Sequence, residues 1–568
     1  MTTSSKISLK SLSTFLGLVL TFSFAFNVLG MEQEGETGGE REKSSIRAVV
    51  DGTARGDVIG NKFSTVNLWQ YQSWSPSAKD EGANLSEFVE SVQFMQATGG
   101  NASRDLFLDP GNTDVQDDYD FSSLIEACDT VLKLGAKPHI KFSVPDKFSK
   151  DSVVDCFGVD VLPPDDYEAY YRYVRAIVLA LIDKFSLEEV QTWGFGVLVE
   201  FENLNWFHDK DTSPEGSREA FFKLYDYTVA ALCELLGDDV WIGAHAMACT
   251  EGLWDERELL NHCATGKNAK TGESPIPIKY FAVSFYDDAP NSPHPMTLAE
   301  TVNRIRERAN ELGLTNLRYG VDEGRILGSR KGKFKTDLTF RVVGHTYQSA
   351  YDARLFKIMI DNDIDYFSSW TYSSSSPWNG YPLISFRLAQ NASKFKNCRS
   401  LAVHTDKRLK DDADCDVVAG LDEPNQTLRL MCYNFKFDLD YSQSLDTTLE
   451  VDVPFWRGRN VQVTTTIIDD EENFFTEWLK DKEQLSIPDE AFSWSPDSGN
   501  LDVGWIDPDS REKYFTLLRD KYATMANKAP RHTVDTVMVS EEGKLVFNGE
   551  LGPHGVAFYT IQVVDENK

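Results

Sequence analysis

Short apolar runs of strand length alternate with longer amphipathic runs of helical period between about residues 62 and 393. The expected strands are Phe63–Leu68, Arg104–Leu108, His139–Val144, Gly194–Val199, Val240–Ala244, Lys279–Phe285, Leu317–Val321 and Tyr366–Trp370. The expected helices between them include Leu85–Ala97, Phe121–Leu134, Tyr167–Phe185, Arg218–Leu236, Leu298–Leu312 and Gly344–Asn362. Eight such units predict a parallel (β/α)8 TIM barrel. The alternative, an open doubly wound sheet, is disfavoured because no Gly-rich dinucleotide or phosphate motif follows the first strand.

The pattern changes after about residue 394, where short runs alternate apolar and polar residues between Asp, Asn, Gly and Pro. The expected strands are Ser400–Thr405, Leu428–Phe437, Thr447–Val453, Val461–Ile468, Val534–Val539, Lys544–Phe547 and Val556–Val563. One helical insertion is expected over Asp507–Ala526. This texture predicts a C-terminal antiparallel β-sandwich.

The N-terminus has the pattern of a secretory signal peptide. Lys6 and Lys10 precede an apolar stretch, Leu12–Val28, which ends close to small residues. A membrane anchor is the alternative, because the stretch is nearly long enough to span a bilayer, but its Ser, Thr and Asn residues favour a signal. The predicted organisation is therefore a signal peptide (1–30), a disordered linker (31–45), a barrel (46–393) and a sandwich (394–568).

Two glutamates directly follow apolar runs of the predicted barrel. Glu200 follows Trp193–Val199, and Glu323 follows Leu317–Asp322. Barrel strands deliver catalytic carboxylates to the rim in this way, and a pair of them can cleave a glycosidic bond. One acid protonates the leaving oxygen, while the other attacks the anomeric carbon or directs water at it. Glu202 has the same strand parity as Glu200 and is its rival. The simpler interpretation of Glu200 and Glu323 is that both are solvated acids at strand ends.

Composition narrows the possible partners. The chain has 568 residues, with 57 Lys and Arg against 89 Asp and Glu, giving a formal charge of −32. This charge disfavours nucleic acid and anionic membranes as partners. The eight cysteines suit an oxidising compartment, and Cys415 and Cys432 are the best candidates for a disulfide. No metal-ligand spacing or cofactor motif is present, so neither a metal nor a cofactor is expected.

Several motifs together resemble glycoside hydrolase family 39, the retaining β-xylosidases and α-L-iduronidases of clan A. Trp193-Gly-Phe-Gly-Val-Leu-Val-Glu200 resembles the fourth-strand motif of the family, and Gly135-Ala-Lys-Pro resembles its third-strand region. Arg104 is similar to its second-strand arginine, Glu323 to its seventh-strand acid and Trp370 to the tryptophan that ends its eighth strand. The family layout also places an N-terminal strand, about Ile46–Val50, on the sandwich, and it closes with a segment like Gly552–Tyr559.

The resemblance implies a role for each candidate site residue. Glu200 would be the acid/base and Glu323 the nucleophile. Glu323 would have to stay ionised, and Arg325, Arg104 or Tyr286, the last at the end of the sixth strand, could hydrogen-bond it. The other expected substrate-binding residues are Asn67, Trp69, Arg104, His245, Arg325 and Trp370. One departure matters, because Val199 occupies the place of the Asn that binds the sugar 2-hydroxyl in clan A, a contact that strengthens in the transition state.

The predicted function is therefore that of a secreted retaining glycoside hydrolase. The resemblance implies a pocket and exo action on oligosaccharides from plant or algal polysaccharide. Neither the sugar, the anomer nor the oligomeric state is fixed by the sequence. The alternative is a noncatalytic carbohydrate-binding protein on a degenerate hydrolase barrel; Val199 favours it, whereas two retained acids argue against it.

Overall fold

The computed structural model describes most of the chain after residue 42. The described residues are 43–68, 85–95, 99–154, 158–248, 252–287, 296–326, 346–369, 384–410, 412–438, 440–469, 475–487, 508–518, 521, 524–525 and 530–564. The predicted signal peptide lies outside these residues, as do Trp69 and Trp370.

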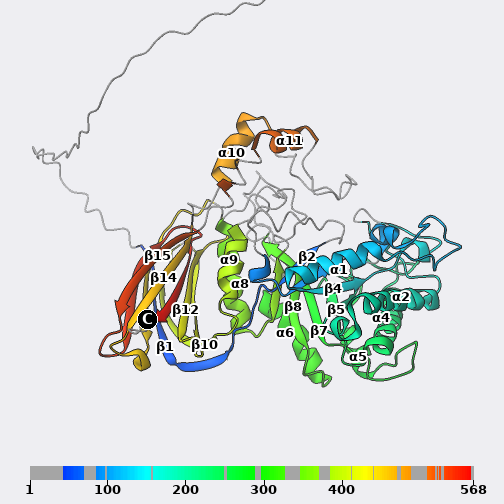
Figure 1. Cartoon of the computed structure of the whole chain (residues 1–568), viewed down its shortest axis with the longest axis horizontal. Helices are drawn as coiled ribbons and strands as arrows, with labels where there is room; N and C mark the ends of the chain where they lie inside the picture. Colours follow the sequence, from blue (N-terminus) through cyan, green and yellow to red (C-terminus); the bar gives the residue numbers. More distant parts are fainter. Residues whose placement is uncertain are drawn as a thin grey trace, which may run out of the picture. The chain divides into compact units, whose positions relative to one another are not determined.

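Eight parallel strands form the first sheet in sequential order, from β2 to β9. They are β2 (Thr65–Leu68), β3 (Ser91–Phe94), β4 (Lys137–Phe142), β5 (Gly194–Val197), β6 (Trp241–Ala246), β7 (Tyr280–Asp287), β8 (Arg318–Ile326) and β9 (Tyr366–Ser369). The backbone N–H of Phe367 on β9 donates to the Lys62 carbonyl just before β2, at 2.8 Å. The two edges of the sheet therefore meet, and the predicted TIM barrel is confirmed (Figure 1).

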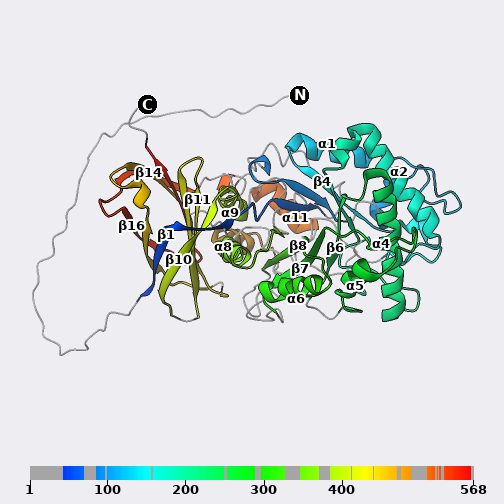
Figure 2. The same cartoon turned by 90° about the horizontal axis from the view of Figure 1, so that it is seen from below.

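Helices cover the outside of the barrel strands (Figure 2). They are α1 (Ser122–Leu134), α2 (Tyr167–Phe185), α3 (Leu187–Val190), α4 (Pro214–Leu236), α5 (Glu258–Thr265), α6 (Leu298–Glu311), α8 (Thr346–Asp361) and α9 (Ile384–Ser393). The start of α6 is fixed by its capping residues. The Thr297 side chain accepts from the backbone N–H of Glu300, and the Glu300 side chain accepts from the backbone N–H of Thr297, which completes a capping box. Within the described part of the chain, no helix is long and apolar enough to cross a membrane.

The second barrel strand lies earlier in the chain than predicted. The segment predicted as the helix Leu85–Ala97 contains a 3₁₀ turn, η3 (Leu85–Glu87), followed by β3. The predicted strand Arg104–Leu108 falls in another 3₁₀ segment, η4 (Gly100–Leu106). A further 3₁₀ turn, η5 (Asp146–Phe148), follows β4. The prediction was wrong because β3 is short and has the polar Gln93 facing inward, so its apolar residues match a helical period instead.

The second sheet has nine strands in the order β15-β14-β17-β12-β11-β10-β1-β13-β16. The strands are β1 (Ser44–Val58), β10 (Arg399–Arg408), β11 (Asp414–Asp422), β12 (Thr427–Phe435), β13 (Leu445–Asp452), β14 (Asn460–Ile468), β15 (Arg531–Met538), β16 (Lys544–Leu551) and β17 (Val556–Val563). The N-terminal strand β1 lies between β10 and β13, and its pairing with β13 is parallel, which makes the sheet mixed rather than wholly antiparallel.

Side chains from distant strands of this sheet share one core. Val50 on β1, Leu449 on β13, Val463 on β14 and Ile561 on β17 all belong to a single buried cluster. The sheet must therefore bend over on itself, which produces the sandwich layers seen in Figure 1. Strand β11 was not predicted, because its apolar centre is short and flanked by aspartates that resemble a loop.

The insertion between β14 and β15 contains more helix than predicted. The described part comprises α10 (Phe475–Gln484), α11 (Pro508–Lys513) and a π-helical turn, η10 (Tyr514–Leu518). A 3₁₀ turn, η7 (Pro454–Trp456), precedes β14. Only α11 and η10 lie within the predicted helical segment.

The predicted disulfide between Cys415 and Cys432 is wrong. Both thiols are free and buried in the sandwich core. They lie on adjacent antiparallel strands, but Cys415 is opposite Asn434 and Cys432 is opposite Val417. Such diagonal neighbours are about 7–8 Å apart, beyond the reach of a disulfide.

Candidate active site

The turn that follows β5 carries Glu200 in an unusual backbone conformation. Leu198 has φ of 59° and Glu200 has φ of 46°, both in the left-handed region that non-glycine residues rarely adopt. The turn is held by bonds from the Leu198 N–H to the Phe142 carbonyl and from the Phe201 N–H to the His245 carbonyl. Backbone conformations of this kind persist where surrounding structure enforces them, and they cluster at functional sites.

A bulge in β8 places Glu323. On the neighbouring strand β7, Val283 is opposite Val321 whereas Ser284 is opposite Glu323, so Asp322 is an extra residue. Such a bulge re-aims the side chains around it. Asp322 is completely buried within the barrel, and Glu323 is half-buried. An acid therefore projects at the C-terminal end of β8, where active sites of this fold lie.

Strand β7 connects both glutamates through two residues of the same parity. The Ser284 hydroxyl donates to Oε1 of Glu200 at 2.6 Å, and the Tyr286 hydroxyl donates to Oε1 of Glu323. Residues two apart on a strand point to the same face. One strand thus brings the two carboxylates to a single location, and the expected bond between Tyr286 and Glu323 is confirmed.

Glu200 accepts further bonds from the loop that follows it. Asn203 Nδ2 donates to its Oε2 at 2.8 Å, and Trp206 Nε1 donates to the same oxygen. Phe201 and Phe207 are fully buried beside this loop. Three donors thus hold a nearly buried carboxylate in one orientation, and each favours its charged form.

Glu323 has a strongly perturbed proton affinity. Burial raises its pKa to about 8, and the negative charge of Glu200 adds to this effect, while the Tyr286 hydroxyl and the Lys141 ammonium oppose it. The expectation that Glu323 is ionised is therefore not met in the free protein. Burial outweighs the Tyr286 hydrogen bond, which lowers the pKa, and Arg104 pairs with Asp146 instead. At neutral pH Glu323 therefore carries a proton in the free protein.

A layer of polar side chains lies beneath the two glutamates. Alternate strands contribute Asn67 from β2, Lys141 from β4, His245 from β6 and Asp322 from β8, and all four are fully buried. Lys141 Nζ is 2.8 Å from Asp322 Oδ2 and 2.9 Å from His245 Nδ1. Barrel interiors stack four side chains from alternate strands in each layer, and those are usually Val, Ile or Leu. This barrel therefore has a polar layer where an apolar one is usual.

The charges in this layer compensate one another. Burial lowers the pKa of Lys141, and the Asp322 carboxylate opposes that shift. Burial lowers the pKa of His245 well below its usual value, and the Lys141 charge lowers it further, so the ring is neutral. Burial alone would raise the pKa of Asp322, but Lys141 and other neighbours bring it well below the usual range. An ion pair beside a neutral imidazole is the resulting state.

Asp322 is held from further strands. Its Oδ1 accepts from Gln93 Nε2 at 2.6 Å and from the Tyr366 hydroxyl at 2.5 Å, while its carbonyl accepts from Asn67 Nδ2 at 3.0 Å. Two glycines leave space for tyrosine side chains in the barrel interior. A Cβ at Gly196 would lie 2.6 Å from the Tyr280 hydroxyl, and one at Gly320 would overlap the Tyr366 ring.

Three expected substrate-binding residues lie away from the position where a sugar would contact them. Asn67 and His245 are fully buried beneath the acids, and both ring nitrogens of His245 are engaged by Lys141 and Ser284. Arg104 lies on η4 rather than at a strand end, is half-exposed, and pairs with Asp146 at 2.7 Å. The sequence could not distinguish a buried structural residue from a substrate-binding one, because burial of a polar strand residue depends on its partners. Trp69, Trp370 and the Arg325 side chain lie outside the described residues.

Glu202, the rival of Glu200, is directed elsewhere. Its Oε1 accepts from the Ala248 N–H at 2.8 Å, beyond the end of β6. Burial raises its pKa to about 8, and the Glu256 charge adds to this. A raised pKa alone would not have distinguished Glu202 from Glu323, but the hydrogen bonds to β7 do.

Sequence reasoning missed Ser284, Asn203, Lys141 and Gln93. Two signals were present. Lys141 interrupts an apolar strand run, where an unpaired charge is too costly, so a buried partner was implied. Ser284 precedes Tyr286 by two residues and therefore shares its face.

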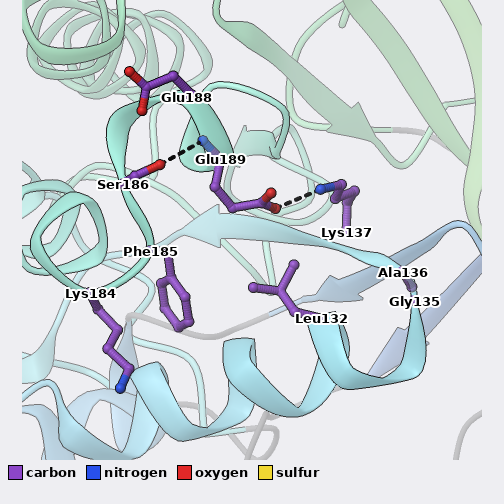
Figure 3. A pocket seen from close by; sticks show the side chains of 9 residues that line it. All are labelled: Leu132, Gly135, Ala136, Lys137, Lys184, Phe185, Ser186, Glu188 and Glu189. Carbon is purple, nitrogen blue, oxygen red and sulfur yellow. Dashed lines mark hydrogen bonds and ion pairs between the residues drawn. The ribbon is translucent and has the colours of Figure 1, made fainter.

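The pocket drawn in Figure 3 lies away from this site. It is lined by the end of α1, the start of β4, and Lys184, Phe185, Ser186, Glu188 and Glu189, and Lys137 pairs there with Glu189 at 2.6 Å. Lys137 begins β4, whereas Lys141 is near the end of that strand. The pocket is thus at the N-terminal end of the barrel, where this fold does not place catalysis. Among the described residues, no group of three or more His, Cys, Asp or Glu side chains is placed to bind a metal ion.

Comparison with known proteins agrees with this geometry. Residues 105–316 match the model of Glycosyl hydrolases family 39, a span that contains Glu200 and ends before Glu323. Over this span the chain is similar to glycoside hydrolase family 39. The curated β-xylosidase of Geobacillus stearothermophilus is 24% identical over 268 residues, which cover 45% of this chain and 49% of that protein. The matched region thus spans about half the length of this relative.

Solved structures of family members share the fold. The family 39 enzyme from Xanthomonas axonopodis pv. citri has a TM-score of 0.63 at 13% identity, with 93% of this chain and 100% of that chain covered. A monomeric β-xylosidase from Caulobacter crescentus CB15 has a TM-score of 0.63 at 14% identity, with 91% and 100% covered. The resemblance to the family is therefore confirmed in both sequence and fold.

Proposed function

We propose that the protein is a retaining glycoside hydrolase in which Glu200 is the acid/base and Glu323 the nucleophile. The observation that carries the proposal is the pair of bonds from β7, where Ser284 holds Glu200 and Tyr286 holds Glu323. A single acid at the end of an apolar strand can lie at the rim by chance, so it is weak evidence for a site. Two acids fixed by adjacent same-face donors of one strand form a site suited to double displacement.

The shared proton gives the two acids their different tasks. In the free protein the raised pKa of Glu323 places the proton there at neutral pH. A glycosidic oxygen bound beside Glu200 can accept a hydrogen bond from Glu200 only when the Glu200 carboxyl is protonated. Substrate binding therefore favours the proton on Glu200 and leaves Glu323 ionised, with Tyr286 as its donor. Glu323 then attacks the anomeric carbon as Glu200 protonates the leaving oxygen. Glu200 next removes a proton from the water that releases the sugar.

The substrate class follows from the relatives rather than from the site. The curated relative is a β-xylosidase, which supports an exo-acting enzyme on xylose-like units of plant or algal oligosaccharides. A noncatalytic carbohydrate-binding protein is the second candidate. Val199, a buried apolar residue where clan A has a sugar-binding Asn, favours it.

Alanine variants of the two acids test the assignment. Glu323→Ala removes the nucleophile, so kcat should fall by about 10³-fold or more on every glycoside, and azide should restore turnover from the same face. Glu200→Ala should reduce turnover of substrates with poor leaving groups far more than that of activated aryl glycosides, which leave without a proton. Azide should then yield a glycosyl azide of retained configuration. NMR of the first-formed anomer checks retention.

Glu202→Gln is the matched control, because Glu202 shares the strand-end loop but bonds to Ala248. It should affect good and poor leaving groups equally. The assignment fails if both alanine variants lose activity equally on all leaving groups and azide rescues neither. Sugar binding without turnover, in the wild type and in both variants, would support the noncatalytic alternative instead.

Export across a membrane is part of the proposal. Lys6, Lys10 and the apolar stretch Leu12–Val28 support a cleaved signal. Expression of the full chain in a secreting host, followed by N-terminal sequencing, should yield a soluble product that begins near residue 31. A full-length product in the membrane fraction would contradict it.

A further inference from the structure

A chain of hydrogen bonds runs from the ion pair in the barrel interior to Glu200. Lys141 Nζ is 2.9 Å from His245 Nδ1, His245 Nε2 is 2.8 Å from the Ser284 hydroxyl, and that hydroxyl is 2.6 Å from Glu200 Oε1. Lys141, His245 and Ser284 come from three different strands, and each is at most 4% exposed. Water therefore does not compete for these contacts.

The direction of every bond in this chain is determined by elementary chemistry. Ser284 has a single hydroxyl hydrogen and donates it to Glu200, so it must accept from the Nε2–H of His245. His245 is neutral, and with its proton on Nε2 it must accept at Nδ1. Of the residues that the structure describes, Lys141 is the one placed to donate there, and its ammonium form is retained by Asp322 at 2.8 Å. The ion pair thus fixes the tautomer of His245.

We propose that Ser284, oriented by His245 and Lys141, is a positioning residue that holds Glu200 as a hydrogen-bond acceptor and thereby assists the step in which Glu200 acts as a base. The inference rests on the proposed function, because it assigns a device to the proposed acid/base. Asp322 stands at the far end of the chain and directly precedes Glu323 in sequence.

Other groups around Glu200 have separate effects. Glu323 interacts with it from β8 as a second carboxyl group, and Asn203 and Trp206 donate to its second oxygen from its own loop. These contacts remain when Ser284 is changed. Replacement of Ser284 therefore isolates the contribution of the chain at Oε1.

The test measures the titration of Glu200 directly. Wild type, Ser284→Ala, Ser284→Thr and His245→Ala would be labelled with ¹³C at the glutamate carboxyl carbons, and the Glu200 signal would be assigned with Glu200→Gln. Ser284→Ala removes a donor to the charged form, so the midpoint for Glu200 should rise by about one pH unit. The alkaline limb of kcat/KM should move in the same direction, and turnover of activated aryl glycosides, limited by the base step, should fall about 10-fold. Ser284→Thr retains the hydroxyl and should restore the wild-type midpoint.

A double variant distinguishes a connected chain of hydrogen bonds from contacts that act independently. If His245 acts through Ser284, the shift in Ser284→Ala/His245→Ala should equal that in Ser284→Ala alone. Ser368→Ala, at a buried serine of β9, is the control and should leave the midpoint unchanged. An unmoved Glu200 midpoint in Ser284→Ala, or additive shifts in the double variant, would overturn the proposal. If Ser284→Ala does not fold, His245→Ala alone should still raise the midpoint, and no change there would also overturn it. The NMR midpoint needs no turnover, so it remains decisive even if the alanine variants of the acids show that the protein is not a glycosidase.

Discussion

At the scale of single residues, the environment of a carboxylate decides its task more than its position in the sequence does. Glu200, Glu202 and Glu323 all follow apolar runs, and all are held in or near the barrel. Glu200 receives three donors, Glu323 one, and Glu202 points toward Ala248. Burial raises the pKa of Glu202 and of Glu323 alike to about 8, so their hydrogen-bond partners, and not their pKa values, distinguish their tasks.

The raised pKa of Glu323 makes stability depend on pH. In the unfolded chain this carboxyl titrates near pH 4.5, and in the folded protein near pH 8. Stability from this group is therefore complete below about pH 4.5, falls as pH rises, and is lost above about pH 8. Glu323→Gln removes the titration, so the variant should match wild type at pH 5 and exceed its free energy of unfolding by about 2–4 kcal/mol at pH 8.5.

Urea unfolding at several pH values measures this difference, with the exposed Glu126→Gln as the control. Glu202 titrates in a similar range, but it is present in both proteins and cancels. A constant difference between wild type and Glu323→Gln from pH 5 to 8.5 would show that Glu323 is not desolvated as the structure places it.

At the scale of elements, periodicity predicted seven of the eight barrel strands, because their inward faces are mostly apolar. It failed at β3, where inward-facing Gln93 is satisfied by Asp322 on a distant strand. The turn after β5 and the bulge in β8 were not predicted either, because neither has a sequence pattern of its own. The site acids were found because they follow apolar runs. Their supports, Ser284 and Lys141, were not, because hydrogen bonds between strands are set by the closed barrel.

Close packing around the polar layer predicts an effect at Gly320 on β8. A Cβ there would overlap the ring of Tyr366, whose hydroxyl binds Asp322. Gly320→Ala should therefore destabilise the protein by about 1–3 kcal/mol and reduce activity, because the displaced ring releases Asp322. Gly111→Ala is the control, since its Cβ would meet only the Asp109 carboxylate at 3.8 Å. In Gly320→Ala the midpoint of thermal unfolding and kcat/KM should both fall, whereas in Gly111→Ala neither should change.

At the scale of the whole molecule, the described groups that bond to the two acids come from the barrel region, whereas the second sheet supports that region from outside. Helix α8 follows the β8 region, and its Tyr347 and Tyr351 lie 5.4 and 5.9 Å from the ring of Phe435 on β12. Arg354 on the same helix pairs with Asp414 of β11 at 2.7 Å. Side chains of β12 therefore complete the burial of a barrel helix, and both belong to one apolar cluster.

This shared cluster predicts that barrel and sandwich unfold together. Phe435→Ala removes a fully buried ring from the contact with α8 and should cost about 3–5 kcal/mol. If the two parts form one cooperative unit, the variant should lower a single transition seen by both tryptophan fluorescence and circular dichroism. Phe547→Ala is the control, because Phe547 lies on β16 and stacks on Tyr559 within the second sheet, away from α8. It should have the smaller effect. Two separate transitions in Phe435→Ala, with activity lost only in the second, would show that the barrel holds its site without the sandwich.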